Sequence, residues 1–533
     1  MKTLKTYLFK SILLFTLLPV IFNCSKNEDV EKKQETQKEE EVTETFNYTS
    51  TSKYSLNVIY FIPKDMSIRT DSHRRLSEIL LQGQEFYKQN MISYGFGEKT
   101  FGLFEDKEKD RVKITYIEGK HNASNYPSSG GGTAMRGEIQ AYFDKNPTEK
   151  ASEHFLVTFP VDDPKTADVS YYGQGKWSFA SDFNDMDIKH LGNGGTLGTN
   201  ATTYIGGMLH ELGHGLNLPH NKEKVSDASS TSKGTSLMGN GNYTYGYTST
   251  FLSEASCAIL NNNQVFNNTD NQFYAGATAS VTDLNVTYSN GNIDISGRID
   301  SDVPVNSINI YHDPADDNTD YDAVSWSTKV ESDNTFTIAT PIDELHKKGN
   351  IPYVLRLGLN HTSGDMTYIS YAYKFVNDIP IIDIGEKDYT SRINWSINDF
   401  SSEQTGGLEN TGLASAILDN NPDTYWHSCY SGSCSSGAAY PHSITVDTGA
   451  LITVDGFAFT QRQNLSRSIK DLEILISDDN ATWTSTGDYT LLKSNNVQNI
   501  RLKNQAAFRY FKIVAKSAHD ENRFAALAEV FCF

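Results

Sequence analysis

Apolar residues in the first half of the chain follow two patterns, short continuous runs and longer stretches with helical spacing. In residues 75–90, Leu76, Ile79 and Leu80 recur on one helical face, which is typical of an amphipathic helix. Strands are predicted at 56–63, 112–117 and 154–159, and helices at 75–90, 133–143 and 251–260. Because the two kinds of element alternate, we predict an α/β layer.

Beyond about residue 275, the apolar runs become short and alternate with polar residues. Residues 284–288 and 293–295 flank Asn290-Gly291, a dipeptide that strongly favours a two-residue hairpin turn. Comparable runs follow at 308–311, 335–338, 353–359 and 368–375. The pattern predicts an immunoglobulin-like β-sandwich over residues 275–378.

One loop of this sandwich is crowded with aspartates, namely Asp313, Asp316, Asp317, Asp320 and Asp322. They could bind calcium, but their spacing does not match the calcium-binding loop of an EF-hand, so a solvated loop is favoured. We find no combination of residues suited to catalysis in residues 275–378. The sandwich is therefore predicted to be a spacer.

The N-terminus has the composition of an export signal. Lys2, Lys5 and Lys10 accompany an apolar run that ends before Cys24, and the run is too short for a stable membrane-spanning helix. Residues 24–51 are rich in Glu, Lys, Gln and Thr, which predicts a disordered acidic tether. Loss of the three lysines with the signal changes the formal net charge from −20 to −23, and this acidity argues against nucleic acid as a partner.

The densest candidate chemistry lies in residues 201–221, which read ATTYIGGMLHELGHGLNLPHN. If residues 202–216 form a helix, His210 and His214 leave the same face, close enough to bind one metal ion. Glu211 lies between them and points partly aside. That position suits a general base that reaches a water molecule better than it suits a metal ligand.

His220 supplies a third ligand if the chain turns back after the helix, and Asn217 is predicted to make that turn with a positive φ. The resulting string, HExxHxxNxxH, resembles that of the metzincin zinc peptidases, which carry glycine in place of Asn217. The resemblance implies one catalytic Zn²⁺ held by the three histidines, with Glu211 as the general base. It also implies a methionine turn below the imidazoles, for which Met238 in the string SLMG is the candidate.

Cys24, which directly follows the predicted signal, resembles the lipidated first residue of bacterial lipoproteins, and the acidic Glu28 and Asp29 resemble the surface-export signal of Bacteroidota lipoproteins. The resemblance implies a lipid anchor in the outer membrane and exposure at the cell surface. A plain secretory signal followed by a solvated linker stays open as the alternative.

The last part of the chain, residues 390–533, resembles the discoidin or coagulation-factor type C domain in the strings ILDNNPDTYWHS, YPHSITVDTG, GFAFTQRQN, SDDNATW, FRYFKI and LAEVF. This resemblance implies a jelly-roll β-sandwich that binds carbohydrate, with a calcium ion held by Asp419, Thr424 and Glu529. Residues in or near its sugar-binding loops are His427, Arg462, Asn522 and Phe524. Some members bind lipid head groups or proteins, so the class of ligand stays open.

The chain has five cysteines. In an exported protein, Cys429 and Cys434 are close enough in sequence to form a disulfide. Cys257 and Cys532 are then left free.

The predicted organisation is a multidomain chain: signal peptide 1–23, tether 24–51, metzincin-like α/β domain 52–270, immunoglobulin-like β-sandwich 275–378 and discoidin-like domain 390–533. The predicted function is that of a zinc metalloendopeptidase that cleaves proteins or glycoproteins and is directed to them by a glycan-binding module. Two other classes stay open, a carbohydrate-binding adhesin lipoprotein whose zinc site is not proteolytic, and a zinc amidase.

Overall fold

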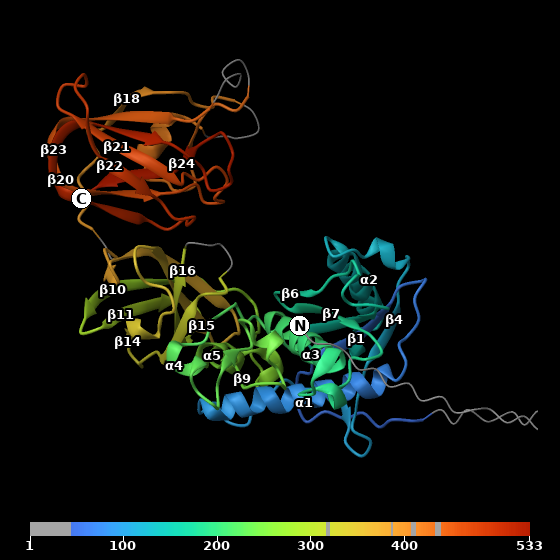
Figure 1. The fold of residues 1–533 in the computed structure, drawn as a ribbon. Coiled ribbons are helices and arrows are strands. Elements are labelled where there is room, and N and C mark those ends of the chain that lie inside the picture. The colour runs from blue at the N-terminus through green and yellow to red at the C-terminus, as the bar shows by residue number, and fades with distance from the viewer. Residues whose placement is uncertain (1–43, 316–319, 385–386, 407–411, 432–438) are drawn as a thin grey trace, which may run out of the picture. The chain divides into compact units, whose positions relative to one another are not determined.

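The computed structural model describes residues 44–315, 320–384, 387–406, 412–431 and 439–533 (Figure 1). The predicted signal peptide, Cys24 and residues 25–43 of the tether lie outside these ranges. Residues 46–51, also predicted as tether, join the first domain, where Thr49 N donates to Glu105 O at 3.0 Å. In the described residues, no helix has the length and apolar character needed to cross a membrane.

A five-stranded mixed sheet in the order β4-β1-β5-β7-β6 forms the centre of the first domain (Figure 1). Its strands are β1 (Asn57–Ile62), β4 (Thr115–Glu118), β5 (Phe155–Pro160), β6 (Tyr172–Gln174) and β7 (Trp177–Asp182). β6 pairs antiparallel with β7 at one edge, whereas the other four strands are parallel. Neither β6 nor β7 is predicted by the apolar pattern, because β6 is short and β7 mixes serines with its apolar residues.

The predicted helices of the first domain are present with shifted limits. They are α1 (Ser72–Ser93), α2 (Gly131–Lys145), α3 (Gly195–Gly215) and α5 (Glu254–Asn262), and the short helix α4 (Val225–Ala228) was not predicted. The short strands are β2 (Glu105–Asp106), β3 (Arg111–Val112), β8 (Thr235–Ser236) and β9 (Thr250–Phe251). α5 begins later than predicted because the Ser253 side chain caps it by accepting from Ser256 N. α3 packs along β7 and β6, and this burial compensates for the glycines in its sequence.

The second domain is a sandwich of two antiparallel sheets, β10-β11-β14 and β13-β12-β15-β16-β17. Its strands are β10 (Ala279–Ser289), β11 (Asn292–Ser301), β12 (Val305–Pro314), β13 (Val324–Lys329), β14 (Thr335–Pro341), β15 (Pro352–His361), β16 (Met366–Val376) and β17 (Ile379–Ile381). The predicted hairpin is confirmed: β10 and β11 pair across Asn290 and Gly291, which have φ of 49° and 80°. Positive φ at both residues is what a type I′ turn requires.

The third domain is a second β-sandwich with a core of its own, drawn from residues 395–532. Its main sheet runs β18-β20-β23-β21-β22, with β25 paired to β20, and β19 pairs with β24. The strands are β18 (Ser396–Phe400), β19 (Trp426–His427), β20 (His442–Thr460), β21 (Asp471–Ser477), β22 (Thr484–Thr490), β23 (Gln498–Ala515), β24 (Ala526–Leu527) and β25 (Glu529–Cys532).

The cysteines agree with their prediction as far as they are described. Cys429 is disulfide-bonded, and its predicted partner Cys434 lies outside the described residues. Cys257 and Cys532 are buried free thiols, as predicted.

The first two domains meet through buried polar contacts. Asn309 Nδ2 donates to Ala255 O of α5 at 2.9 Å, and the side-chain amides of Asn262 and Asn306 exchange hydrogen bonds of 2.9 Å and 2.6 Å. Because these buried amides satisfy one another's hydrogen-bonding groups, the second domain is fixed against α5. α5 belongs to the same domain as the histidine motif.

Candidate metal and catalytic site

Three imidazoles converge at the carboxyl-terminal end of α3. His210 and His214 lie one turn apart on the helix, and His220 returns to them after the helix ends. The Nε2 atom of His214 is 3.2 Å from that of His210 and 3.0 Å from that of His220. The three ligand atoms all lie within 4.8 Å of one another, as binding of a single metal ion requires.

Backbone carbonyls set the orientation of two of these rings. His210 Nδ1 faces Leu237 O at 2.6 Å, and His214 Nδ1 faces Leu218 O at 2.8 Å. Since a carbonyl only accepts, each Nδ1 carries the proton and each Nε2 keeps its lone pair for a metal ion. Burial lowers the pKa of His210 to about 4 and that of His220 to about 3, which keeps both rings neutral at physiological pH. Three neutral imidazoles of this kind fit zinc.

Glu211 lies on the same turn of α3, next to the edge strand β6. Burial raises the pKa of Glu211 to about 7, and a hydrogen bond from Gly173 N–H opposes the rise. A Cβ atom at Gly173 would lie 2.3 Å from His214 Cβ and 2.4 Å from Glu211 O, so only glycine permits this approach of strand and helix. The outer edge of β6 therefore lies beside the site, where an extended peptide can add to the sheet.

The turn after α3 is as predicted, with Asn217 at φ 70°. Leu218 N donates to Gly213 O at 3.0 Å, which closes the helix end and directs the chain towards His220. Met238 is fully buried on the other side of Gly213, where an added Cβ would be 2.4 Å from Met238 Sδ. The predicted methionine turn thus lies against the helix segment between His210 and His214.

The second domain contributes an aromatic residue to this site. Tyr321, between β12 and β13, stacks on the His220 imidazole with ring centroids 3.7 Å apart, and its ring lies 6.4 Å from that of His210. Burial and the negative charge of Glu211 raise the pKa of Tyr321, so its phenol stays protonated at neutral pH. Tyr321 is 40% exposed and is therefore accessible to a ligand.

Ion pairs fix the segment that carries Tyr321. Asp320 pairs with Arg356 at 3.1 Å, and Asp322 pairs with Lys222 at 2.6 Å and with Lys347 at 2.7 Å. The predictions of a solvated aspartate loop and of a spacer domain are therefore wrong for this segment, because the sandwich packs against the chain just after His220. Asp316 and Asp317 of the same loop lie outside the described residues.

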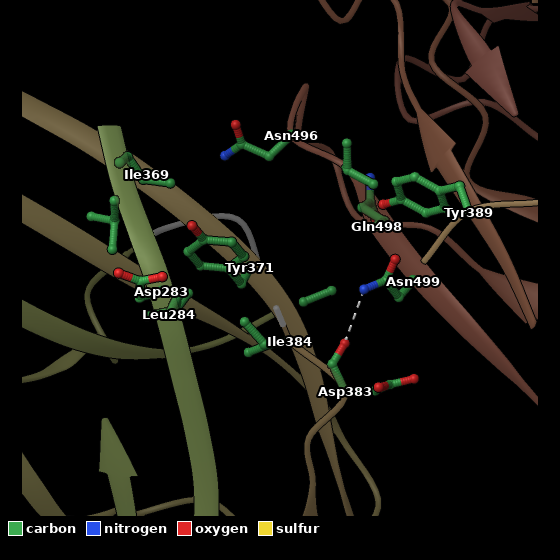
Figure 2. A pocket seen from close by; sticks show the side chains of 13 residues that line it. Asp283, Leu284, Ile369, Tyr371, Asp383, Ile384, Tyr389, Asn496, Gln498 and Asn499 are labelled. Carbon is green, nitrogen blue, oxygen red and sulfur yellow. Dashed lines mark hydrogen bonds between the residues drawn. The ribbon is translucent and has the colours of Figure 1, made fainter. Parts of the chain in front are cut away.

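A hollow of about 270 Å³ elsewhere in the molecule holds no comparable chemistry (Figure 2). Its labelled side chains come from β10, β16, residues 383–389 and residues 496–499, and among its polar contacts Asn499 Nδ2 donates to Asp383 O at 3.4 Å. No histidine or cysteine of the described residues lines it, and it shares no described residue with the histidine site.

The three residues implied for calcium lie close together in the third domain. Thr424 Oγ1 donates to Asp419 Oδ2 at 2.6 Å. Burial and the nearby Asp419 carboxyl raise the pKa of Glu529 to about 7, although Arg392, which donates to Glu529 Oε2 at 2.6 Å, opposes the rise. Glu529 Oε1 is buried without a hydrogen-bond partner in the part of the chain that the structure describes. An orphaned carboxylate oxygen beside a second carboxyl group fits a hard cation such as calcium.

The four residues implied for sugar binding have different environments. His427 is only 3% exposed, and its Nδ1 donates to Ser428 O at 2.6 Å, so this ring does not offer the surface contact expected of it. Phe524 and Asn522 share one loop, and Asn522 Oδ1 is buried without a hydrogen-bond partner among the described residues. Arg462 lies over the Tyr425 ring at 4.2 Å, an aromatic contact that the sequence reasoning missed although Tyr425 stands within the string YWHS.

Comparison with known proteins identifies the last domain of the chain. The model of the F5/8 type C domain matches residues 397–530, which confirms the predicted discoidin-type domain. A sialidase of Micromonospora viridifaciens is 33% identical over 144 residues, and a galactose oxidase of Gibberella zeae is 26% identical over 148 residues. The chain covers only 20% of the length of each, so these likenesses concern one domain.

A second likeness extends over most of the chain. Wild-type OgpA from Akkermansia muciniphila has 34% sequence identity and a TM-score of 0.58 over 64% of this chain and 99% of that one. A catalytically inactive OgpA, solved with an O-glycopeptide (glycodrosocin) substrate, has the same identity and a TM-score of 0.59. The chain therefore belongs to the family of OgpA, and it carries an F5/8 type C domain as well.

Proposed function

We propose that this protein is a zinc-dependent endopeptidase that hydrolyses peptide bonds of glycoproteins. The observation that carries the proposal is the convergence of His210, His214 and His220 beside Glu211 and the edge strand β6. That OgpA has been solved with an O-glycopeptide substrate supports the class of substrate.

His210, His214 and His220 would hold a zinc ion, which would supply Lewis-acid activation of a water molecule and of the scissile carbonyl. The substrate binds as an extended strand along β6, so that its scissile bond lies beside Glu211. The Glu211 carboxylate takes a proton from the attacking water and passes it to the departing amine. The Tyr321 hydroxyl donates a hydrogen bond to the carbonyl oxygen as that oxygen gains negative charge.

The other parts of the chain place the enzyme on its substrate. The F5/8 type C domain binds glycan through Arg462, Asn522 and Phe524, and a structural calcium ion is held by Asp419, Thr424 and Glu529. Export with a lipid on Cys24 anchors the protein to the outer membrane, where it meets glycoproteins outside the cell.

Zymography on casein and on mucin, with and without a chelator, tests this proposal. The wild-type protein should clear both substrates only when metal is present, and Glu211→Gln should lower the turnover by about 10³-fold while keeping the metal. The exposed Glu108→Gln is the matched control. Binding to mucin without cleavage would favour the adhesin, and cleavage of cell-wall amides but not of casein would favour the amidase.

A further inference from the structure

A groove of about 420 Å³ opens directly onto the histidine site. His214 and Pro219 line it from the zinc-binding segment, and Lys176 lines it from the turn after β6. Met366 and Tyr368 of β16 form the opposite wall. Because β6 also bounds this groove, a peptide lying along that strand continues into it.

Among the residues that the structure describes, Lys176 is the one cationic residue that lines this groove. Its Nζ lies 4.1 Å from the centre of the Tyr274 ring, and it forms no ion pair within the described ranges. The Tyr274 hydroxyl is itself fixed by His154 Nε2 at 2.6 Å and by Gln264 N at 3.1 Å. The aromatic face therefore orients the ammonium group without neutralising its charge.

Asp365, the acidic residue of the groove, already accepts hydrogen bonds from residues other than Lys176. Asp365 Oδ2 accepts from Ser363 Oγ at 2.9 Å and from Gly276 N at 3.2 Å, and it makes no ion pair with Lys176. The side-chain amide of Asn217, which also lines the groove, makes no hydrogen bond in the described part of the chain. Two donor groups, one of them charged, thus face a hollow whose walls include Pro219 and Met366.

We propose that this groove is a substrate subsite for a carboxylate, which pairs with Lys176 and accepts a hydrogen bond from Asn217. The inference rests on the proposed peptidase function and names a feature of the substrate. The carboxylate belongs either to an acidic residue of the peptide or to a sialic acid on its glycan. Both present the same charge-assisted acceptor, and the partly enclosed walls strengthen its attraction to the ammonium group.

Steady-state cleavage by the full-length, zinc-loaded protein tests the subsite. One peptide series carries a single Asp at each of four positions on either side of the scissile bond, and its reference peptide is neutral. A pair of O-glycopeptides differs only by a terminal sialic acid. The measured quantity is the ratio of kcat/KM for the acidic substrate to that for its neutral counterpart.

We expect the wild-type ratio to reach about tenfold at one peptide position or for the sialylated glycopeptide, and Lys176→Met to reduce it to about one. Lys176→Arg should retain the ratio, and Lys176→Glu should favour a peptide with Lys at the same position. Lys107, an exposed residue in the turn after β2, provides the control. Lys107→Met also removes a lysine but should leave the ratio unchanged.

If only the Asp peptides show a ratio that depends on Lys176, the carboxylate belongs to the peptide. If only the sialylated glycopeptide shows it, the carboxylate belongs to the glycan. Equal ratios in the wild-type protein and in Lys176→Met for every substrate would overturn the subsite while leaving the peptidase intact. Failure of the wild-type protein to cleave any of these substrates would overturn both proposals. Zinc content and the unfolding temperature of each variant separate loss of the subsite from loss of the fold.

Discussion

The candidate zinc site and the candidate sugar and calcium sites differ in how far apart their residues lie in the sequence. In the first domain, all three imidazoles and the Glu211 carboxylate come from residues 210–220, on one helix and the turn after it. In the third domain, Asp419 and Glu529 are brought together from distant parts of the sequence, and His427 faces inward. A site built within one helix and turn is determined by local geometry, whereas a site built from loops depends on how the whole sandwich packs.

A further difference lies in the support of each site. The histidines are held by backbone carbonyls, by the close approach of Gly173 and by Tyr321 from the second domain. The third domain has its own core, and its candidate ligand groups all come from residues 395–532 and their immediate neighbours. Changes in the first two domains are therefore expected to affect catalysis, and changes in the third to affect targeting or stability.

The largest effect among these predictions is expected at Tyr321, which tests whether the second domain is part of the catalytic site. Tyr321→Phe should lower kcat by about 10²-fold, because it removes the hydrogen-bond donor to the developing oxyanion but keeps the ring stacked on His220. KM and zinc content should change little. Tyr288→Phe, a similarly exposed tyrosine of the same domain, is the control, and a normal kcat for Tyr321→Phe would return this domain to a supporting role.

A second prediction concerns the contact between β6 and α3. Gly173→Ala places a Cβ atom 2.3 Å from His214 Cβ, so the strand must move away from the helix. A displacement of about 1 Å at a catalytic centre costs up to about 10²-fold in rate, and kcat/KM should fall accordingly. Gly137→Ala, where a Cβ meets nothing within 4 Å, should leave the rate unchanged. Equal rates for the two variants would show that β6 does not position the substrate.

The third prediction separates targeting from catalysis. A protein that ends at Ile384 keeps β17 of the second domain but lacks the third domain and its separate core, so it should still cleave unglycosylated peptides at the full-length rate. On immobilised mucin it should be at least about tenfold slower, because it loses a second attachment that raises the local enzyme concentration.

Within the full-length protein, Arg462→Ala combined with Phe524→Ala should reproduce that loss on mucin. Arg509, which lies on β23 and pairs with Asp447, is the control, and Arg509→Ala should not slow cleavage of mucin. Free sugar should compete with the full-length protein only. Identical mucin rates for all four proteins would leave the domain with a protein-binding role.

The smallest effect concerns calcium. Calcium should raise the unfolding temperature of the third domain by a few degrees, because binding to the folded state alone stabilises it. Asp419→Asn should abolish this shift, and the exposed Asp399→Asn should retain it. The measurement is thermal unfolding in calcium and in a chelator. A shift that survives Asp419→Asn would place the ion elsewhere.

Local features of this protein were predictable wherever a short segment carries its own physical constraint. The spacing of His210 and His214 follows from helical geometry, and the positive φ of Asn217 follows from the need to leave the helix sharply. The Asn290-Gly291 hairpin was predictable for the same reason. The F5/8 type C domain was recognisable because its characteristic strings are spread over nearly the whole domain.

Only the tertiary structure decided the remaining features. Nothing near Tyr321 in the sequence signals that its ring stacks on His220, because their contact depends on how the second domain packs against α5. β6 is too short to show a periodicity, yet its edge lies beside Glu211. Lys176 and Tyr368 meet the same groove although they are far apart in the sequence. These residues become neighbours through burial and through contacts between distant parts of the chain. The apolar pattern within a single segment does not contain that information.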